Sequence, residues 1–292
     1  MKFESFISKI ISRLGLSLVL ASLFTVDGHA LSIKVLTYNT WLFGIDENTP
    51  SMGPLALDVS SRATKICNLL KSKKWDVVFL QEVWAPSVRE KLTDCGYYVS
   101  ASSESVSSLS GLLTLSRWKV VTTIRFPFIN NGQWDHVQDG EMATAKSLLL
   151  TQIETPEGPL FFGNIHAVAR YEDKYYDEQR SEQLKFASGI MDAYPRAIFA
   201  GDFNVAPVGY SYSYVWDDLV NVWLKGWAWS APTQSTYTPE NPNILAKGGF
   251  DEGSLDHIFS SPGSQIHNSH RALDQGDEIF SDHFGWEAVI EF

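Results

Sequence analysis

The chain is short of cysteine and of positive charge, and after its first thirty residues it has no long apolar run. Its 2 cysteines are too few for a zinc cluster, and there is no H-E-x-x-H pair of histidines. The serine-hydrolase turn G-x-S-x-G does not occur, and no dinucleotide or P-loop glycine motif follows a predicted strand. These absences disfavour zinc, serine-nucleophile and nucleotide-binding chemistry.

Acidic residues outnumber basic residues by 34 to 23, and the formal net charge is −11. An acidic surface does not favour tight non-specific binding to nucleic acid or anionic lipid, because both are polyanions. It does not exclude a nuclease, since divalent cations offset the repulsion locally. Nucleic acid is therefore the less favoured partner.

Residues 1–30 have the pattern of a secretory signal peptide. A basic start and an apolar run over 14–26 precede two small residues, Gly28 and Ala30, at the −3 and −1 positions of a cleavage site. The run is too short to span a membrane comfortably. We expect cleavage near Ala30, a secreted or periplasmic protein, and one catalytic domain over 31–292 without a transmembrane segment.

The two cysteines, Cys67 and Cys95, have two possible states. An exported protein forms disulfides readily. Two buried thiols acting as small apolar side chains explain the same residues equally well. The sequence leaves both states open.

Apolar patterning predicts an alternation of strands and helices. Strands are expected over 33–39, 75–81, 111–117, 120–128, 145–154, 159–167, 196–204, 256–261 and 285–292, and helices over 58–72, 86–94, 174–192 and 213–224. The elements do not follow a strict βαβ rhythm, and several neighbouring strands have antiparallel connections. This indicates a layered α/β fold with mixed sheets and not a Rossmann sheet or a barrel.

Polar side chains stand at the ends of these predicted strands. They are acids, amides and imidazoles far apart in sequence: Asn39, Glu82, His166, Asp202, Asn204, Asp256, Asp282 and His283. Their placement indicates one site that is assembled by folding. Metal-assisted cleavage of a phosphate ester is the chemistry that suits this set.

Glu82 ends an apolar strand, where a carboxylate is costly unless it is paired or bound to a metal. Asn39 ends the first strand and offers an amide oxygen beside it. Oxygen ligands of this kind favour Mg²⁺ or Mn²⁺. Taken alone, a strand-end carboxylate that caps the backbone would explain Glu82 better.

Asp202 and Asn204 follow a buried strand. If the chain stays extended there, alternation places both side chains on one side, so that one orients or ligates while the other donates to a phosphate oxygen. An ordinary Asx turn is the alternative.

Two histidines, His166 and His283, have matching strand-end contexts. Phosphodiester hydrolysis needs a base for the attacking water and a strong donor for the leaving oxygen. Asp256 is the candidate that orients His283 and fixes its tautomer. His257 faces the other side of its strand, and we interpret it as structural.

In this order along the chain, the polar set resembles the endonuclease/exonuclease/phosphatase superfamily. The resemblance implies a four-layered sandwich of two packed mixed β-sheets flanked by helices, with the site at one end. It implies metal binding by Glu82 with Asn39, and phosphate contacts from His166 and Asn204. It further implies His283 as base supported by Asp256, while Asp202 and Asp282 orient the nucleophile or hold a second ion.

Within that superfamily the details are most similar to neutral sphingomyelinases. The similarity rests on QEVW at 81–84, on a lysine, Lys146, before an apolar strand, on IHAVARY at 165–171, and on the 236–246 loop, where Thr238 replaces the usual Asp. It implies Mg²⁺-dependent hydrolysis of sphingomyelin to ceramide and phosphocholine, with Lys146 near the substrate. We expect a monomer acting on phospholipid at a membrane surface; the alternative is a secreted endonuclease or another phosphate-ester hydrolase of the same fold.

A cluster of tryptophans follows residue 213. Residues 213–224 can form an amphipathic helix that buries Trp216, Leu219, Val220 and Trp223. Exposed Trp227 and Trp229 would instead suit a membrane interface.

Overall fold

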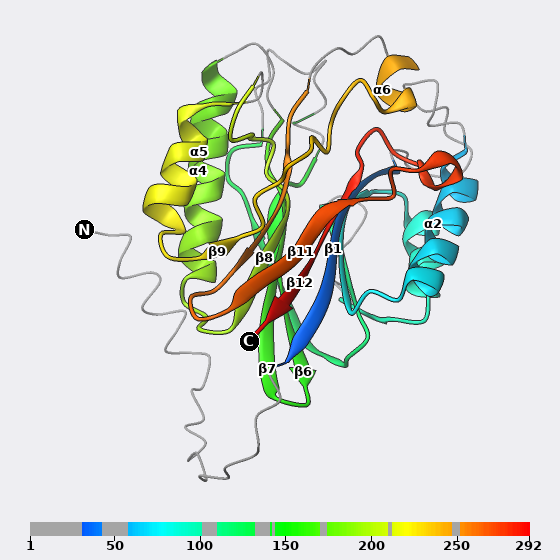
Figure 1. Cartoon of the computed structure of the whole chain (residues 1–292), viewed down its shortest axis with the longest axis horizontal. Helices are drawn as coiled ribbons and strands as arrows, with labels where there is room; N and C mark the ends of the chain where they lie inside the picture. The colour runs from blue at the N-terminus through cyan, green and yellow to red at the C-terminus, as the bar shows by residue number, and fades with distance from the viewer. Residues whose placement is uncertain are drawn as a thin grey trace. The chain divides into compact units, whose positions relative to one another are not determined.

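Two six-stranded sheets pack face to face in the computed structural model (Figure 1). It describes residues 31–42, 58–100, 110–131, 141, 144–169, 174–209, 212–246 and 252–292. The expected signal peptide lies outside these residues. In the described part of the chain, no helix combines the length and apolar character that a membrane crossing requires.

The first sheet has the strand order β11-β12-β1-β2-β4-β3. Its strands are β1 (Ser32–Leu42), β2 (Val77–Val83), β3 (Tyr98–Val99), β4 (Leu113–Ser116), β11 (Gln265–Ala272) and β12 (Gly285–Glu291). The central pair, β1 and β2, is parallel, and the other neighbours are antiparallel.

The second sheet has the order β5-β6-β7-β8-β10-β9. Its strands are β5 (Val120–Pro127), β6 (Ser147–Thr155), β7 (Gly158–His166), β8 (Ala197–Asp202), β9 (Ala228–Trp229) and β10 (Asp256–Ser260). Here β7 and β8 are the parallel pair, and the other neighbours are antiparallel. Both sheets are therefore mixed, as the sequence predicts.

Four of the described helices cover the outer faces of the two sheets, and a fifth, α6, lies at one end of the sandwich (Figure 1). They are α2 (Val59–Lys73), α3 (Pro86–Thr93), α4 (Lys174–Met191), α5 (Tyr214–Asp218) and α6 (Pro242–Ala246), with a π-helical turn over Leu219–Trp223 and a 3₁₀ turn over Gly276–Glu278. Helix α2 lies on one side of the sandwich, and α4 and α5 lie on the other (Figure 1).

Three apolar layers hold these four layers together. Val35 and Phe79 of the first sheet and Phe162 and Ile198 of the second meet between the sheets. Alternate residues of the same strands face the helices, because side chains in a strand point to opposite faces. Thus Leu36 and Leu80 pack with α2 and α3, and Phe199 and Ile165 pack with α4 and α5. The four-layered sandwich is confirmed.

The sequence prediction missed the short elements β3, β9 and α6, and it differs from the structure in two longer segments. Strand β11 was not predicted, because its sequence has no regular apolar alternation and its pairing is interrupted between His267 and His270. The single helix expected over 213–224 is a short α5 followed by the π-helical turn. Trp216 and Leu219 are buried there, whereas Val220 and Trp223 are half-buried.

A disulfide joins Cys67 and Cys95. Cys67 lies in α2, and Cys95 follows α3, so the bond ties the two helices that cover the first sheet. Both cysteines are buried within the apolar layer on that face. The question that the sequence left open is thereby answered in favour of pairing.

Candidate active site

The topology brings six segments to one end of the sandwich. Parallel strands end at the same edge, so Asn39 pairs beside Gln81 and His166 beside Asp202. The strands β10 and β12 run in the opposite direction, so their beginnings reach this edge. Asp256 is the first residue of β10 and lies opposite Asp202, and His283 precedes β12. Strand direction alone therefore gathers the predicted residues.

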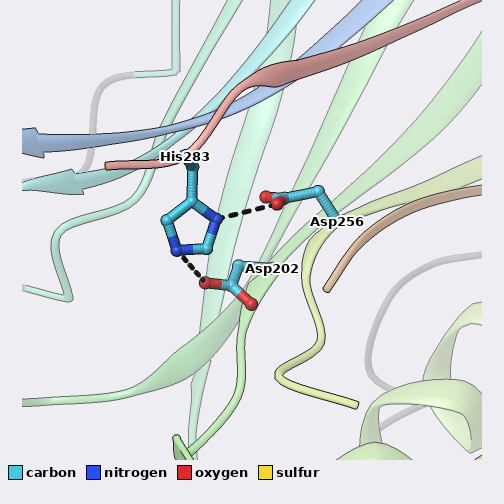
Figure 2. A group of neighbouring side chains, drawn as sticks. All are labelled: Asp202, Asp256 and His283. Carbon is cyan, nitrogen blue, oxygen red and sulfur yellow. Dashed lines mark hydrogen bonds and ion pairs between the residues drawn. The ribbon is translucent and has the colours of Figure 1, made fainter. Parts of the chain in front are cut away.

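His283 lies between two carboxylates (Figure 2). Its Nδ1 is 2.8 Å from Oδ2 of Asp256, and its Nε2 is 3.8 Å from Oδ2 of Asp202. The first distance is a hydrogen bond that fixes which ring nitrogen carries the proton when the ring is neutral. The ligand atoms of these three residues lie within 4.8 Å of one another. The predicted partnership of Asp256 with His283 is present.

Asn39 links the two sheets at the site. Its Nδ2 donates to Oε1 of Glu82 and to Oδ2 of Asp202, each at 3.0 Å. Its Oδ1 accepts from the backbone N–H of Trp41 at 3.1 Å. The amide nitrogen, and not the oxygen, thus faces the carboxylates, so ligation by Oδ1 requires the amide to turn. Asn39 as a metal ligand stays a prediction.

Lys146 lies beside His166. Its ammonium is 3.0 Å from Nε2 of His166, 2.7 Å from the carbonyl oxygen of Ala167 and 3.0 Å from Oε2 of Glu141. The contacts with His166 and Ala167 are hydrogen bonds, and the contact with Glu141 is an ion pair. The geometry makes Lys146 a neighbour of His166, and its contact with substrate stays a prediction.

Asn204 reaches the site by a route that differs from the expected one. Its φ is +51°, in the left-handed region, so the chain is not extended there. The backbone N–H of Asn204 donates to Oδ1 of Asp202 at 2.9 Å, which is the Asx turn that the sequence offered as the alternative. The side-chain Nδ2 donates to the carbonyl oxygen of Ala167 at 3.0 Å. Asn204 is buried here, but alternation is not what places it.

Burial and like charges dominate the electrostatics of the cluster. Burial, and then the charge of Asp256, raise the pKa of Asp202 to about 7. Burial and the charge of Asp282 also raise the pKa of Glu82. Burial alone lowers the pKa of His283, but the charge and hydrogen bond of Asp256 outweigh it and raise that pKa to about 10.

The pKa of His166 moves in the opposite direction. Burial, followed by the charges of Lys146 and His283, holds it well below its ordinary value. His166 is therefore a neutral ring near pH 7. The two histidines differ because His283 is flanked by carboxylates, whereas His166 has a buried ammonium in contact.

The buried side-chain amides of Gln81 and Asn164 form hydrogen bonds between the two sheets next to the site, and this role was not predicted. Gln81 Nε2 donates to Oδ1 of Asn164 at 2.8 Å, which joins β2 to β7 across the sheets. Asn164 Nδ2 in turn donates to the carbonyl oxygens of Leu80 and Leu113 at 3.1 and 3.2 Å. An amide within an otherwise apolar strand is the sequence signal that would have identified Asn164.

The 236–246 loop holds the turn that carries His283. Asn241 and Asn243 both donate through Nδ2 to the carbonyl oxygen of Ser281, at 3.0 and 2.7 Å. Ser281 Oγ donates to the carbonyl oxygen of Asn39 at 2.7 Å and lies 3.2 Å from the backbone nitrogen of His283. The Asn-rich loop therefore acts on the site through backbone groups.

His257 and Trp227 are structural. His257 is fully buried, and its Nε2 is 2.8 Å from the carbonyl oxygen of Val205. Trp227 is buried and donates to Asp192 at 3.3 Å, and the half-buried ring of Trp229 packs against Trp216. The burial of Trp227 contradicts an exposed interface ring at that position, whereas Trp229 is half-buried and its membrane-interface role stays a prediction.

The donor set suits a hard divalent cation. Asp202, Asp256 and Asp282 are buried carboxylates and Glu82 is a half-buried one, all at one end of the sandwich. Like charges of this density are costly without a compensating cation. Oδ1 of Asp256 and Nδ1 of His166 are buried with no hydrogen-bond partner in the described part of the chain. Oxygen donors in excess of their protein partners are what Mg²⁺ or Mn²⁺ binds.

Known proteins share this architecture. A structure of beta toxin from Staphylococcus aureus with bound magnesium ions superposes with a TM-score of 0.69 at 19% identity, covering 88% of this chain and 99% of that one. Sphingomyelinase C from Streptomyces griseocarneus gives a TM-score of 0.67 at 19% identity, covering 89% and 99%. At this identity the likeness shows the fold alone.

Sequence comparison identifies relatives of greater length. A Drosophila melanogaster protein named as a neutral sphingomyelinase is 29% identical over 192 residues, 62% of this chain and 41% of that protein. The inositol phosphosphingolipids phospholipase C of Saccharomyces cerevisiae is 26% identical over 228 residues, 68% of this chain and 46% of that protein. The chain thus spans less than half the length of these curated relatives. The model of the Endonuclease/Exonuclease/phosphatase family matches residues 36–283, and the chain belongs to that family.

Proposed function

We propose that this protein is a secreted, Mg²⁺-dependent phosphodiesterase that hydrolyses sphingomyelin to ceramide and phosphocholine. The observation that carries the proposal is the His283–Asp256 hydrogen bond beside the carboxylates of Glu82, Asp202 and Asp282. The names of the sphingolipid-hydrolase relatives support the choice of substrate.

The attacking water is activated at Nε2 of His283. Asp256 occupies Nδ1, so the free lone pair of the neutral ring faces Asp202, 3.8 Å away. A water beside these groups, within hydrogen-bond reach of Nε2, loses its proton to Nε2 while its oxygen forms the new bond to phosphorus. The bond from phosphorus to the ceramide oxygen breaks, and that oxygen leaves with a proton from solvent or a neighbouring donor.

The remaining groups orient the phosphate. Neutral His166 and the Asn204 amide are the proposed contacts to its oxygens, and Lys146 holds His166 in place. Glu82 and Asp282, with Asn39 after its amide turns, are the proposed ligands of Mg²⁺ or Mn²⁺. When bound, the cation supplies positive charge that stabilises the phosphate oxygens and lowers the pKa of its acidic neighbours.

The proposal is tested with the purified protein and three substrates: sphingomyelin, phosphatidylcholine and plasmid DNA. Phosphocholine released from sphingomyelin under Mg²⁺ or Mn²⁺, in preference to the other two reactions, is the expected result. No phosphocholine from sphingomyelin counts against the proposal. Nicking of the plasmid instead would support the endonuclease alternative, which the net charge of −11 disfavours.

The cellular setting belongs to the same proposal. The signal-peptide pattern of residues 1–30 supports export, and we propose a monomer that meets its phospholipid at a membrane surface. Mass determination of the exported protein tests cleavage near Ala30, and sedimentation tests the monomer.

A further inference from the structure

Arg62 is a buried cation of α2 to which the proposed mechanism gives no role. It is 7% exposed. Its guanidinium donates to three main-chain carbonyl oxygens, at 2.7 Å to Trp41, 2.7 Å to Phe280 and 3.4 Å to Thr40. These carbonyls belong to two segments more than two hundred residues apart in sequence.

The first segment needs this partner because β1 is irregular at its end. The pairing of β1 with β2 shifts register between Asn39 and Leu42, and Trp41 has a φ of +46°. An irregularity of this kind turns carbonyls out of the ladder of the sheet. The planar guanidinium of Arg62 presents several N–H donors in a fixed arrangement, and these donate to the carbonyl oxygens of Trp41 and Thr40. The guanidinium also lies 5.4 Å from the centre of the Trp41 ring.

The second segment leads directly into the catalytic turn. Phe280 precedes Ser281, whose hydroxyl bonds back to the carbonyl oxygen of Asn39 at 2.7 Å. The charges of Asp282 and Glu82 both act on Arg62, so the guanidinium lies within electrostatic reach of the two proposed metal-binding carboxylates. Arg62 thus contacts the backbone on both sides of the proposed cation site.

We propose that Arg62 is a positioning residue that holds the Asn39–Glu82 side and the Asp282–His283 side of the site at the spacing that a divalent cation requires. The proposal rests on the function proposed above. It assigns Arg62 no contact with substrate. Its effect is exerted through Trp41 and Phe280, whose carbonyl oxygens it binds.

Two substitutions test this role, Arg62→Met and Arg62→Lys. Methionine removes the charge and the donors, whereas lysine keeps the charge without the fork. Arg62 lines a cavity of about 790 Å³ together with Lys65, Asn243 and Phe280. Water can therefore fill the space that the methionine or lysine side chain leaves. Arg196→Met is the matched control. Arg196 also donates to a backbone carbonyl, that of Glu157 at 2.7 Å, and lies 5.6 Å from the ring of Phe292.

The main measurement is the thermal midpoint of the purified full chain as Mg²⁺ is titrated, which gives an apparent affinity without any turnover. We expect Arg62→Met to weaken Mg²⁺ binding by roughly tenfold and to lower kcat by about 10- to 100-fold, with little change in KM. Effects of this size are typical of residues that orient metal ligands without binding the metal themselves. Arg62→Lys should restore part of both. The Arg196→Met control should match the wild type in Mg²⁺ affinity and kcat.

A purely structural Arg62 would give a different pattern. Arg62→Met would then lower the midpoint of the metal-free protein but leave Mg²⁺ affinity and the kcat of the folded molecules unchanged, and that result would overturn the proposal. If Arg62→Met does not fold, wild-type Mg²⁺ affinity in folded Arg62→Lys overturns it. A wild type that binds Mg²⁺ but releases no phosphocholine refutes the proposed function alone, because the affinity comparison still decides the role of Arg62.

Discussion

At the scale of single residues, the hydrogen bond between Asp256 and His283 decides whether His283 is a base. The carboxylate accepts from Nδ1 and leaves Nε2 free to take a proton. In the metal-free protein the surrounding carboxylates hold a proton on His283, because they raise its pKa to about 10. Base catalysis near neutral pH therefore needs the cation as well as the histidine.

Asp256→Asn should lower kcat by roughly 10²- to 10⁴-fold, the range for loss of an acid–base group. The amide keeps the shape of the carboxylate, but its N–H can donate to Nδ1 and stabilise the tautomer with the proton on Nε2. Steady-state kinetics measure the effect, with the thermal midpoint as a control for folding. A kcat within threefold of the wild type would remove Asp256 from the mechanism.

His257 gives a prediction for stability against pH. Burial lowers its folded-state pKa to about 4, below the ordinary 6.5. The neutral ring therefore makes its full contribution to the unfolding free energy above pH 6.5, and this contribution is lost as the pH falls toward 4. Between pH 7 and pH 5 this costs about 2 kcal/mol of unfolding free energy.

Urea unfolding of the wild type and of His257→Phe at both pH values measures this difference. The variant loses the bond to Val205 and should be less stable at pH 7, but its stability should fall by about 2 kcal/mol less on going to pH 5. Equal losses in the two proteins would show that His257 does not titrate in this range.

At the scale of the elements, the site residues that the sequence predicts well are those that lie at the ends of strands. An apolar run that stops at a polar residue is a local signal, and it identified Glu82, His166 and Asp202. Arg62 and Ser281 have no such signal, because they act on carbonyl oxygens whose positions depend on the whole fold. At Asn204 the extended chain that alternation assumes is replaced by a left-handed turn, which is the Asx turn that the sequence offered as the alternative.

Gly201 shows how closely two of these strands approach. Its φ is +148°, and a Cβ placed on it would lie 2.0 Å from the carbonyl oxygen of Ile165 in β7. Gly201→Ala must therefore separate β7 from β8 beneath His166 and Asp202. We expect a loss of at least about 2 kcal/mol of unfolding free energy, from strain and overpacking.

Gly189→Ala is the matched control for this substitution. Gly189 lies in α4 with open space around the added carbon, and alanine should stabilise the helix by up to about 1 kcal/mol. Urea unfolding compares the two variants. Similar stability in both would contradict the close approach of β7 and β8.

At the scale of the whole molecule, the direction of the central strands determines where the site forms. Each sheet has a parallel pair in its interior, and the pairs end at the same side of the sandwich. The sequence predicts two mixed sheets from the interleaved elements, and the family resemblance adds their packing. Strand β11 and the disulfide depended on tertiary contacts and were not predictable from local pattern.

The Cys67–Cys95 disulfide should stabilise the whole fold. It closes a loop with a sequence separation of 28, for which loss of unfolded-chain entropy amounts to about 3 to 4 kcal/mol. The double variant Cys67→Ala, Cys95→Ala should lose an amount of this order in urea unfolding. Reducing agent should lower the stability of the wild type similarly and leave the double variant unaffected; a wild type insensitive to reduction would contradict the role of the bond.

The proposed function depends on side chains from separate strand ends that meet around one divalent cation and cleave a phosphodiester. Phosphocholine release from sphingomyelin, measured for the wild type and Glu82→Gln with Mg²⁺ and with a chelator, tests it most directly. We expect release that requires Mg²⁺ and that falls by at least about 10²-fold when the Glu82 carboxylate becomes an amide. Release that persists in chelator, or that is equal in the two proteins, would contradict it.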